Sequence, residues 1–176
     1  MPRRARVRWL TEPMRIYLPA TLDELTALAE STRRPASLDL EPRGAHAVTA
    51  ALAAALPDED EEGLEYSAHL AAADDTLALI AASPTADRRR LVLTVEVPDD
   101  AVVAAAGDAT VISPSAVDIV VPVPGAVVVC GHIDETDAVA DVEATLAGDD
   151  DAVERLVERD LLWYDASELP GLVARG

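Results

Sequence analysis

The stretch from Met14 to Leu25 constrains the fold most, because it combines a strand, a turn and the start of a helix. Its first five residues are a β-branched and aromatic run typical of a half-buried strand, and Pro19 lacks the amide that would continue the ladder. Thr21 and Glu24 match a capping box, in which each residue satisfies an amide of the first helical turn. We therefore expect a small α/β domain that begins with this strand.

The residues before Met14 differ from the rest of the chain. They carry four of the 14 basic residues, all of which are arginine, and they lack the apolar stretch of ~7 to 15 residues that a secretory signal needs. We expect residues 1–13 to be a disordered tail or an artefact of start-site choice, and residues 14–176 to form a single domain. A phosphate-binding arm is the functional alternative for the tail.

The composition indicates a soluble protein with an aliphatic core, since Phe is absent and Trp and Tyr are few. The formal net charge of −19 repels phosphates, so we expect no nucleic-acid partner. No apolar run approaches the ~18 residues that cross a bilayer, so we expect no membrane contact. The single cysteine, Cys130, excludes an internal disulfide and fits a cytoplasmic location.

Hydrophobic periodicity predicts five strands, at residues 14–18, 91–97, 116–121, 126–133 and 161–164. The Pro-Gly pair at 124–125 fits either a hairpin between two of them or a bend that leads the second strand elsewhere. Residues 35–44 are expected to be a loop, and residues 101–106 a short helix or loop. We therefore expect an α/β or α+β fold, with a mixed sheet of four to five strands covered by helices.

The longest predicted helix precedes Pro84. Five of its apolar residues recur at alternating steps of four and three, which predicts a buried stripe made of Tyr66, Leu70, Ala73, Leu77 and Ile80. Acidic residues cluster at this and other helix starts, where each can contribute about 0.3 to 1 kcal/mol against the helix dipole. Most of the negative charge is thus explained structurally, and an acidic docking face is the functional alternative.

The segment from Cys130 to Asp134 is the best candidate for chemistry. On a strand Cys130, His132 and Asp134 share one face, which would suit metal ligation or a Cys/His nucleophile pair. Adjacent residues on one strand rarely chelate an ion alone, and no second Cys or His pair follows at zinc-finger spacing. We therefore expect a buried thiol beside a hydrogen-bonded histidine, with no metal and no cofactor.

The other two histidines have ordinary and chemical interpretations. His46 precedes a short helix, where it could pack or act as a general base. His69 lies four residues after Glu65, which suits a helical pair or a metal-binding carboxylate and histidine. Common signatures of hydrolases, nucleotide-binding proteins and metalloproteases are missing from the sequence, and the arginines at 88–90 suggest only an anion site.

Trp163 and Tyr164 are neighbours on a predicted strand, so their side chains face opposite sides. Only one of them can join the core. The exposed one could mark a binding surface, because aromatic side chains anchor interfaces, or it could be an ordinary edge-strand residue.

Several short segments in a fixed order resemble a family of small actinobacterial proteins of unknown function. They are Met-Arg-Ile-Tyr-Leu-Pro-Ala-Thr-Leu at 14–22, Ala-His-Ala-Val-Thr at 45–49, Leu-Glu-Tyr at 64–66, Pro-Val-Pro at 122–124, His-Ile-Asp at 132–134 and Leu-Leu-Trp-Tyr at 161–164. The likeness runs from Met14 to near the C-terminus. The family brings no established activity, so the resemblance implies no catalytic role for any residue.

Two functions are compatible with these patterns. The first is a non-enzymatic interaction or regulatory domain, which contacts a protein partner through its acidic surface and through Trp163 or Tyr164. The second is a small hydrolase or transferase with His46, Tyr66 and His132 around a pocket and Asp134 orienting an imidazole.

Overall fold

The computed structural model describes residues 13–31, 33–107 and 112–173, and they form one α+β unit built on an eight-stranded sheet. The strands are β1 (Pro13–Ala20), β2 (Ser37–Leu40), β3 (Arg43–His46), β4 (Leu91–Pro98), β5 (Val102–Ala104), β6 (Ala116–Ile119), β7 (Val123–Ile133) and β8 (Leu162–Asp165). The helices are α1 (Leu22–Glu30), α2 (Ala50–Ala55), α3 (Glu61–Ala82), α4 (Val139–Leu146), α5 (Asp150–Val157) and α6 (Pro170–Val173), with short 3-10 turns at Asp99–Ala101 and Thr136–Ala138.

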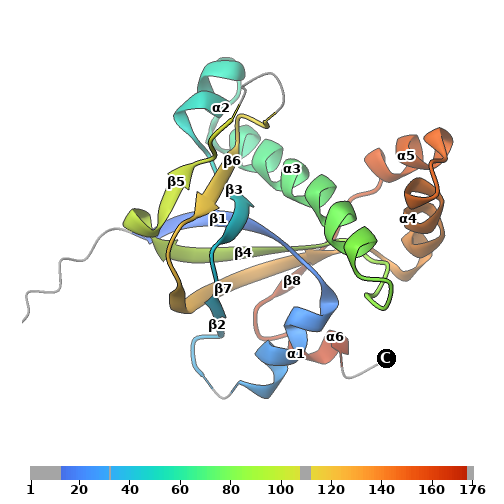
Figure 1. Cartoon of the computed structure of the whole chain (residues 1–176), viewed down its shortest axis with the longest axis horizontal. Coiled ribbons are helices and arrows are strands. Elements are labelled where there is room, and N and C mark those ends of the chain that lie inside the picture. Colours follow the sequence, from blue (N-terminus) through green and yellow to red (C-terminus); the bar gives the residue numbers. More distant parts are fainter. Residues whose placement is uncertain (1–12, 32, 108–111, 174–176) are drawn as a thin grey trace, which may run out of the picture.

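All strand pairings of the described sheet are antiparallel. The strand order is β2-β7-β4-β1-β3-β6-β5, and β8 pairs with the part of β7 that β2 leaves free. The centre is the long pairing of β1 with β4 and of β4 with β7 (Figure 1). The expected mixed sheet of four to five strands was therefore wrong in strand number and in direction.

The three strands that the sequence did not predict, β2, β3 and β5, are only three or four residues long. Each pairs with a longer strand or with a neighbour far away in the sequence. The second strand leads elsewhere instead of forming a hairpin, because β6 pairs with β3 and β5 while β7 joins β4. The Pro-Gly pair itself lies inside β7, where the register with β2 shifts. Short strands of this kind are stabilised by partners and not by their own residue pattern.

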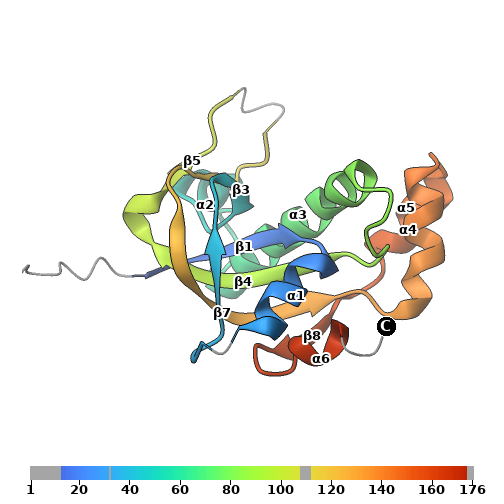
Figure 2. The same ribbon diagram turned by 60° about the horizontal axis from the view of Figure 1, so that its bottom comes forward.

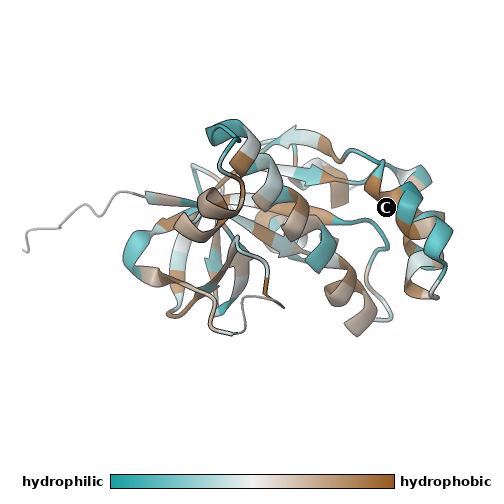
Figure 3. Cartoon of the chain, turned by 90° about the horizontal axis from the view of Figure 1, so that it is seen from above, coloured by the Kyte–Doolittle hydropathy of each residue, from teal (hydrophilic) through white to brown (hydrophobic). Residues whose placement is uncertain are grey.

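Helices cover both faces of the sheet (Figures 1 and 2). On one face α1 and α6 enclose the larger core, in which Leu25 and Leu28 pack with Leu18 and Leu93. On the other face α3 crosses the sheet and packs its alanines against Tyr17 and Val92. The α4–α5 hairpin extends beyond the sheet, at the right of Figure 3, and carries both hydrophilic and hydrophobic residues.

The helix starts follow the expected capping chemistry. The Glu24 carboxylate accepts the Thr21 N–H at 2.9 Å, Thr49 Oγ1 accepts from the Leu52 amide at 3.0 Å, and Asp60 accepts from the Gly63 amide at 3.0 Å. At the other end of α3, Arg88 donates to the Ile80 carbonyl at 2.9 Å. These contacts support the prediction that much of the charge satisfies helix ends.

The buried stripe of α3 agrees with the predicted one at Ala73 and Ile80 but differs at Tyr66 and Leu70, which are exposed. Its sheet-facing residues include Ala68, His69, Ala72 and Ala73, whereas Tyr66 is 55% exposed. Because α3 is rich in alanine, apolar residues surround the whole helix and the sequence pattern does not identify the inner face. Small side chains occupy that face because they let the helix lie close to the sheet.

The first strand begins one residue earlier than predicted, since Pro13 belongs to β1 and pairs with Pro98. Residues 1–12 of the predicted tail, which was expected to span residues 1–13, lie outside the described residues. In the described part of the chain, the helices are either too short or too polar to cross a membrane.

A buried ion pair joins the ends of β4 and β7. The Arg90 guanidinium donates to both Asp134 carboxylate oxygens, at 2.9 and 2.8 Å, and the Arg90 amide donates to the same carboxylate at 2.9 Å. Arg90 also reaches the Leu156 carbonyl of α5 at 3.4 Å. Asp134 therefore holds the sheet and the α4–α5 hairpin together, and it does not orient an imidazole.

We expect Asp134→Ala to lower the free energy of unfolding by ~3 to 5 kcal/mol, because it leaves the Arg90 guanidinium buried without its carboxylate. Urea unfolding followed by circular dichroism measures this loss. The matched control is the double variant Arg90→Met/Asp134→Leu, which removes both charges and should lose less than the single variant. A single-variant loss below about 1 kcal/mol, the value of an exposed pair, would contradict the account.

Candidate functional site

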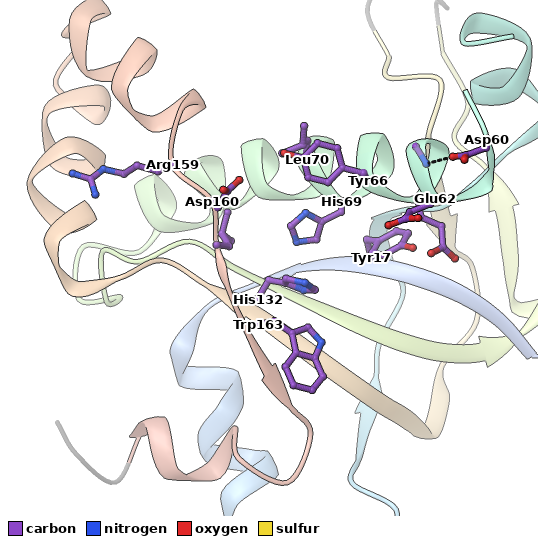
Figure 4. Close-up of a pocket in the computed structure, with 13 residues that line it drawn as sticks. Tyr17, Asp60, Glu62, Tyr66, His69, Leu70, His132, Arg159, Asp160 and Trp163 are labelled. Atoms are coloured by element: carbon purple, nitrogen blue, oxygen red, sulfur yellow. Dashed lines mark hydrogen bonds between the residues drawn. The ribbon is translucent and has the colours of Figure 1, made fainter. Parts of the chain in front are cut away.

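A cleft of about 600 Å³ lies between α3, the C-terminal half of β7 and the segment that leads into β8. Residues of α3 form one wall, and His132 of β7 and Trp163 of β8 form the other (Figure 4). Arg159, Asp160 and Leu161 close one end. The cleft therefore joins segments that are distant in the sequence, and it exists only once α3 has packed onto the sheet.

Two histidines meet inside this cleft. The ring centroids of His69 and His132 lie 4.3 Å apart, with an angle of 61° between the ring planes. His69 is only 8% exposed, and its Nε2 is buried with no hydrogen-bond partner in the described structure. The same holds for Nδ1 of His132. Each imidazole thus keeps one buried polar atom that the rest of the described fold does not satisfy.

Burial favours the neutral form of both rings. Burial, together with the smaller effects of the nearby His132 and Arg90, lowers the pKa of His69 from 6.5 to about 4. Burial also lowers the pKa of His132. A pair of neutral imidazoles can accept hydrogen bonds. A neutral imidazole is also the form required of a general base, although its lowered pKa makes His69 a weak one.

Three aromatic side chains surround the histidines. Tyr17 meets the His69 ring edge to face, with centroids 6.2 Å apart, and its own pKa is raised by burial and by the charge of Glu65. Tyr66 and Trp163 are 55% and 59% exposed. The His69, His132 and Trp163 rings follow one another from α3 to β8 in Figure 4. The cleft is therefore aromatic inside and open to solvent at its rim.

Carboxylates dominate the charge of the cleft. Asp60, Glu62, Glu65 and Asp160 line it against a single basic residue, Arg159. Arg159 is bound through Nε and Nη2 to Asp141 of α4, at 2.9 and 2.8 Å. Its positive charge is thus partly offset by a carboxylate outside the cleft, which Arg155 shares. A cation entering the cleft meets an excess of negative charge.

The structure brings together some of the predicted site residues and separates others. Tyr66, His132 and Trp163 line the cleft. Asp134 and Tyr164 line a different cavity of about 310 Å³, and Tyr164 packs against the larger core. Trp163 and Tyr164 do face opposite sides of the sheet, as expected, and Trp163 is the exposed one.

His46 does not line the cleft, so the expectation that it surrounds one pocket with Tyr66 and His132 was wrong. Its side chain is buried between Ser115, 2.8 Å from Nδ1, and Asp75 of α3, 3.1 Å from Nε2. Both ring nitrogens are thus engaged, and the ring links β3 to the loop before β6 and to α3. This is the packing interpretation of the residue.

His69 lines the cleft, although the sequence suggested that it pairs with Glu65 on the same helix. Glu65, its expected helical partner, binds Arg15 at 3.2 Å instead. The available signal was the run of small residues Ala68, Ala72 and Ala73, which marks the inner face of α3 and places His69 beside it. Within the described residues, no group of three or more His, Cys, Asp or Glu side chains could hold a metal ion.

We expect His69 to make the protein less stable as the pH falls. Histidine has a pKa of 6.5 when unfolded and His69 about 4 when folded, so in this window the unfolded state binds the extra proton. The contribution of His69 to stability is therefore fully present above pH 6.5, and it decreases as the pH falls from 6.5 towards about 4. His69→Gln removes this contribution and should give a shallower dependence in urea unfolding at a series of pH values. Equal slopes for variant and parent would contradict the prediction.

Comparison with known proteins places the chain in a family. No curated protein and no solved structure matches it. A family model described as a family of unknown function (DUF6912) matches residues 14–173, which include the cleft and nearly all of the sheet. The match begins at Met14, where the resemblance in the sequence also begins. The chain therefore belongs to this family of unknown function (DUF6912).

Proposed function

We propose that the protein is a non-enzymatic interaction domain whose cleft receives a positively charged segment of a protein partner. The observation that carries this proposal is the pair of exposed aromatic side chains, Tyr66 and Trp163, on a cleft lined by carboxylates. Aromatic anchors dominate the energetics of many interfaces, especially when they border a pocket. A partner of opposite charge follows from the acidic lining.

Electrostatics supports a basic partner in two ways. The whole chain carries a formal net charge of −19, which attracts cations and speeds their encounter with the surface. Within the cleft, Arg159 is held by Asp141 and Glu65 is held by Arg15. Glu62 and Asp160 therefore remain to pair with positive charges of the partner.

A small hydrolase or transferase is the second candidate. The observation in its favour is the pair of neutral imidazoles beside Tyr66 in the same cleft, because an unprotonated histidine can act as a general base. In this candidate enzyme His69 would line the pocket with Tyr66 and His132, in the position that the sequence suggested for His46. The two candidates differ in outcome, since an interaction domain returns its ligand unchanged and a hydrolase or transferase does not.

We expect a peptide of alternating Gly, Lys and Arg to bind the cleft in a saturable way. Trp163 is one of two tryptophans, so Trp9→Phe leaves it as the sole indole, and its fluorescence reports on the cleft. Affinity should fall by about tenfold or more between ~50 and ~300 mM salt, because screening weakens the attraction. Mass spectrometry of the recovered peptide separates the two candidates.

The matched variants test the carboxylates of the cleft. Glu62→Gln/Asp160→Asn should weaken peptide binding, whereas Glu30→Gln on α1, on the opposite face of the sheet, should not. A Gly-Glu peptide serves as the control for charge. Absence of any fluorescence change with the basic peptide at low salt would count against the interaction domain, and cleavage or modification of the peptide would favour the enzyme.

A further inference from the structure

We propose that the His69–His132 pair is the recognition site for an arginine side chain of the partner, with the guanidinium hydrogen-bonded by the two imidazoles and stacked on Trp163. This inference rests on the proposed function and specifies which positive group the cleft selects. It stands on three observations: the contact between the two rings, the unpartnered ring nitrogens and the position of the indole.

The histidine pair offers hydrogen-bond acceptors at the base of the cleft. A neutral imidazole has one donor and one acceptor nitrogen, and His69 and His132 each keep a buried nitrogen without a partner in the described structure. His69 is more than nine-tenths buried and lines the cleft. These two nitrogens are shielded from solvent, so a ligand in the cleft meets the other edge of each ring. A ligand that presents several N–H groups at fixed angles can contact both rings together, because their centroids lie only 4.3 Å apart.

Trp163 adds a flat surface beside the pair. It lies directly across from His132 in the β7–β8 pairing, and antiparallel partners place their side chains on the same face of the sheet. The indole is 59% exposed, so its ring is accessible to a ligand. A planar cation can stack on such a ring while its edge donates hydrogen bonds to the imidazoles (Figure 4).

These features favour guanidinium over other groups. Arginine is planar, weakly hydrated and carries five N–H donors in a rigid fork, whereas the lysine ammonium is a compact and strongly hydrated point charge. An anion would face the carboxylates of Glu62 and Asp160. The chain's own Arg159 does not fill this place, since its guanidinium binds Asp141 on the far side.

The test compares three peptides that differ at one residue: Ac-Gly-Ser-Xaa-Ser-Gly-amide with Xaa as arginine, lysine or citrulline, the neutral isostere of arginine. Calorimetry on the full chain gives the affinities, and the imidazole NMR signals locate the ligand. We expect the arginine peptide to bind about tenfold more tightly than the lysine peptide, because only guanidinium has the required fork. The citrulline peptide should bind more weakly still, and the signals of His69 and His132 should shift.

Two variants of one residue separate hydrogen bonding from packing. His132→Gln keeps an acceptor and should retain most of the preference for arginine, whereas His132→Leu should abolish it. A cooperative thermal unfolding transition shows that each variant is folded. If a variant at residue 132 does not fold, His69→Gln and His69→Leu provide the same comparison on α3.

The outcomes distinguish this inference from the proposed function. Equal affinities for the arginine and lysine peptides, unchanged by His132→Leu, would overturn the arginine site and leave the interaction domain standing. Equal affinities for arginine and citrulline would also overturn it, because charge would then play no part. Failure of these peptides and of the longer basic peptide to bind would remove both proposals.

Discussion

The close packing of α3 on the sheet determines most of what is distinctive in this structure. Ala68, Ala72 and Ala73 are almost fully buried against Tyr17 and Val92, so these positions of the helix present only small side chains to the strands. A larger residue at one of these positions would push the helix outward, because protein interiors have little spare volume. The contact between His69 and the imidazole of β7 depends on this small spacing.

Charged side chains organise the other boundary of the cleft. The buried Arg90–Asp134 pair joins the β4 and β7 ends to α5, and Asp141 joins α4 to α5 by binding Arg155 and Arg159. The segment that follows α5 then leads past the cleft into β8. Ion pairs outside the cleft thus fix the position of the segment that forms one of its walls. The pair with Asp141 also occupies Arg159, the arginine that lines the cleft.

Local features of the structure could be predicted from the sequence, whereas features set by distant partners could not. The capping box at Thr21, the strands β1, β4, β6, β7 and β8 and the opposite orientations of Trp163 and Tyr164 follow from short patterns. The short strands β2, β3 and β5 depend on pairing across the sheet, and the inner face of α3 is hidden by its many alanines. The sequence suggested that His46 and His132 line one pocket because both are histidines. In the structure they lie on β3 and β7, which are separated in the sheet by β4 and β1.

The most direct test of the account is a measurement of ring contacts by NMR. The chain has three histidines, so the imidazole signals are few and can be assigned by substitution. With centroids 4.3 Å apart, the rings of His69 and His132 should give strong nuclear Overhauser cross-peaks to each other, and the Tyr17 ring should give weaker ones to His69. Absence of the His69–His132 cross-peaks in the folded protein would mean that α3 does not place its histidine over β7, and the cleft described above would not exist.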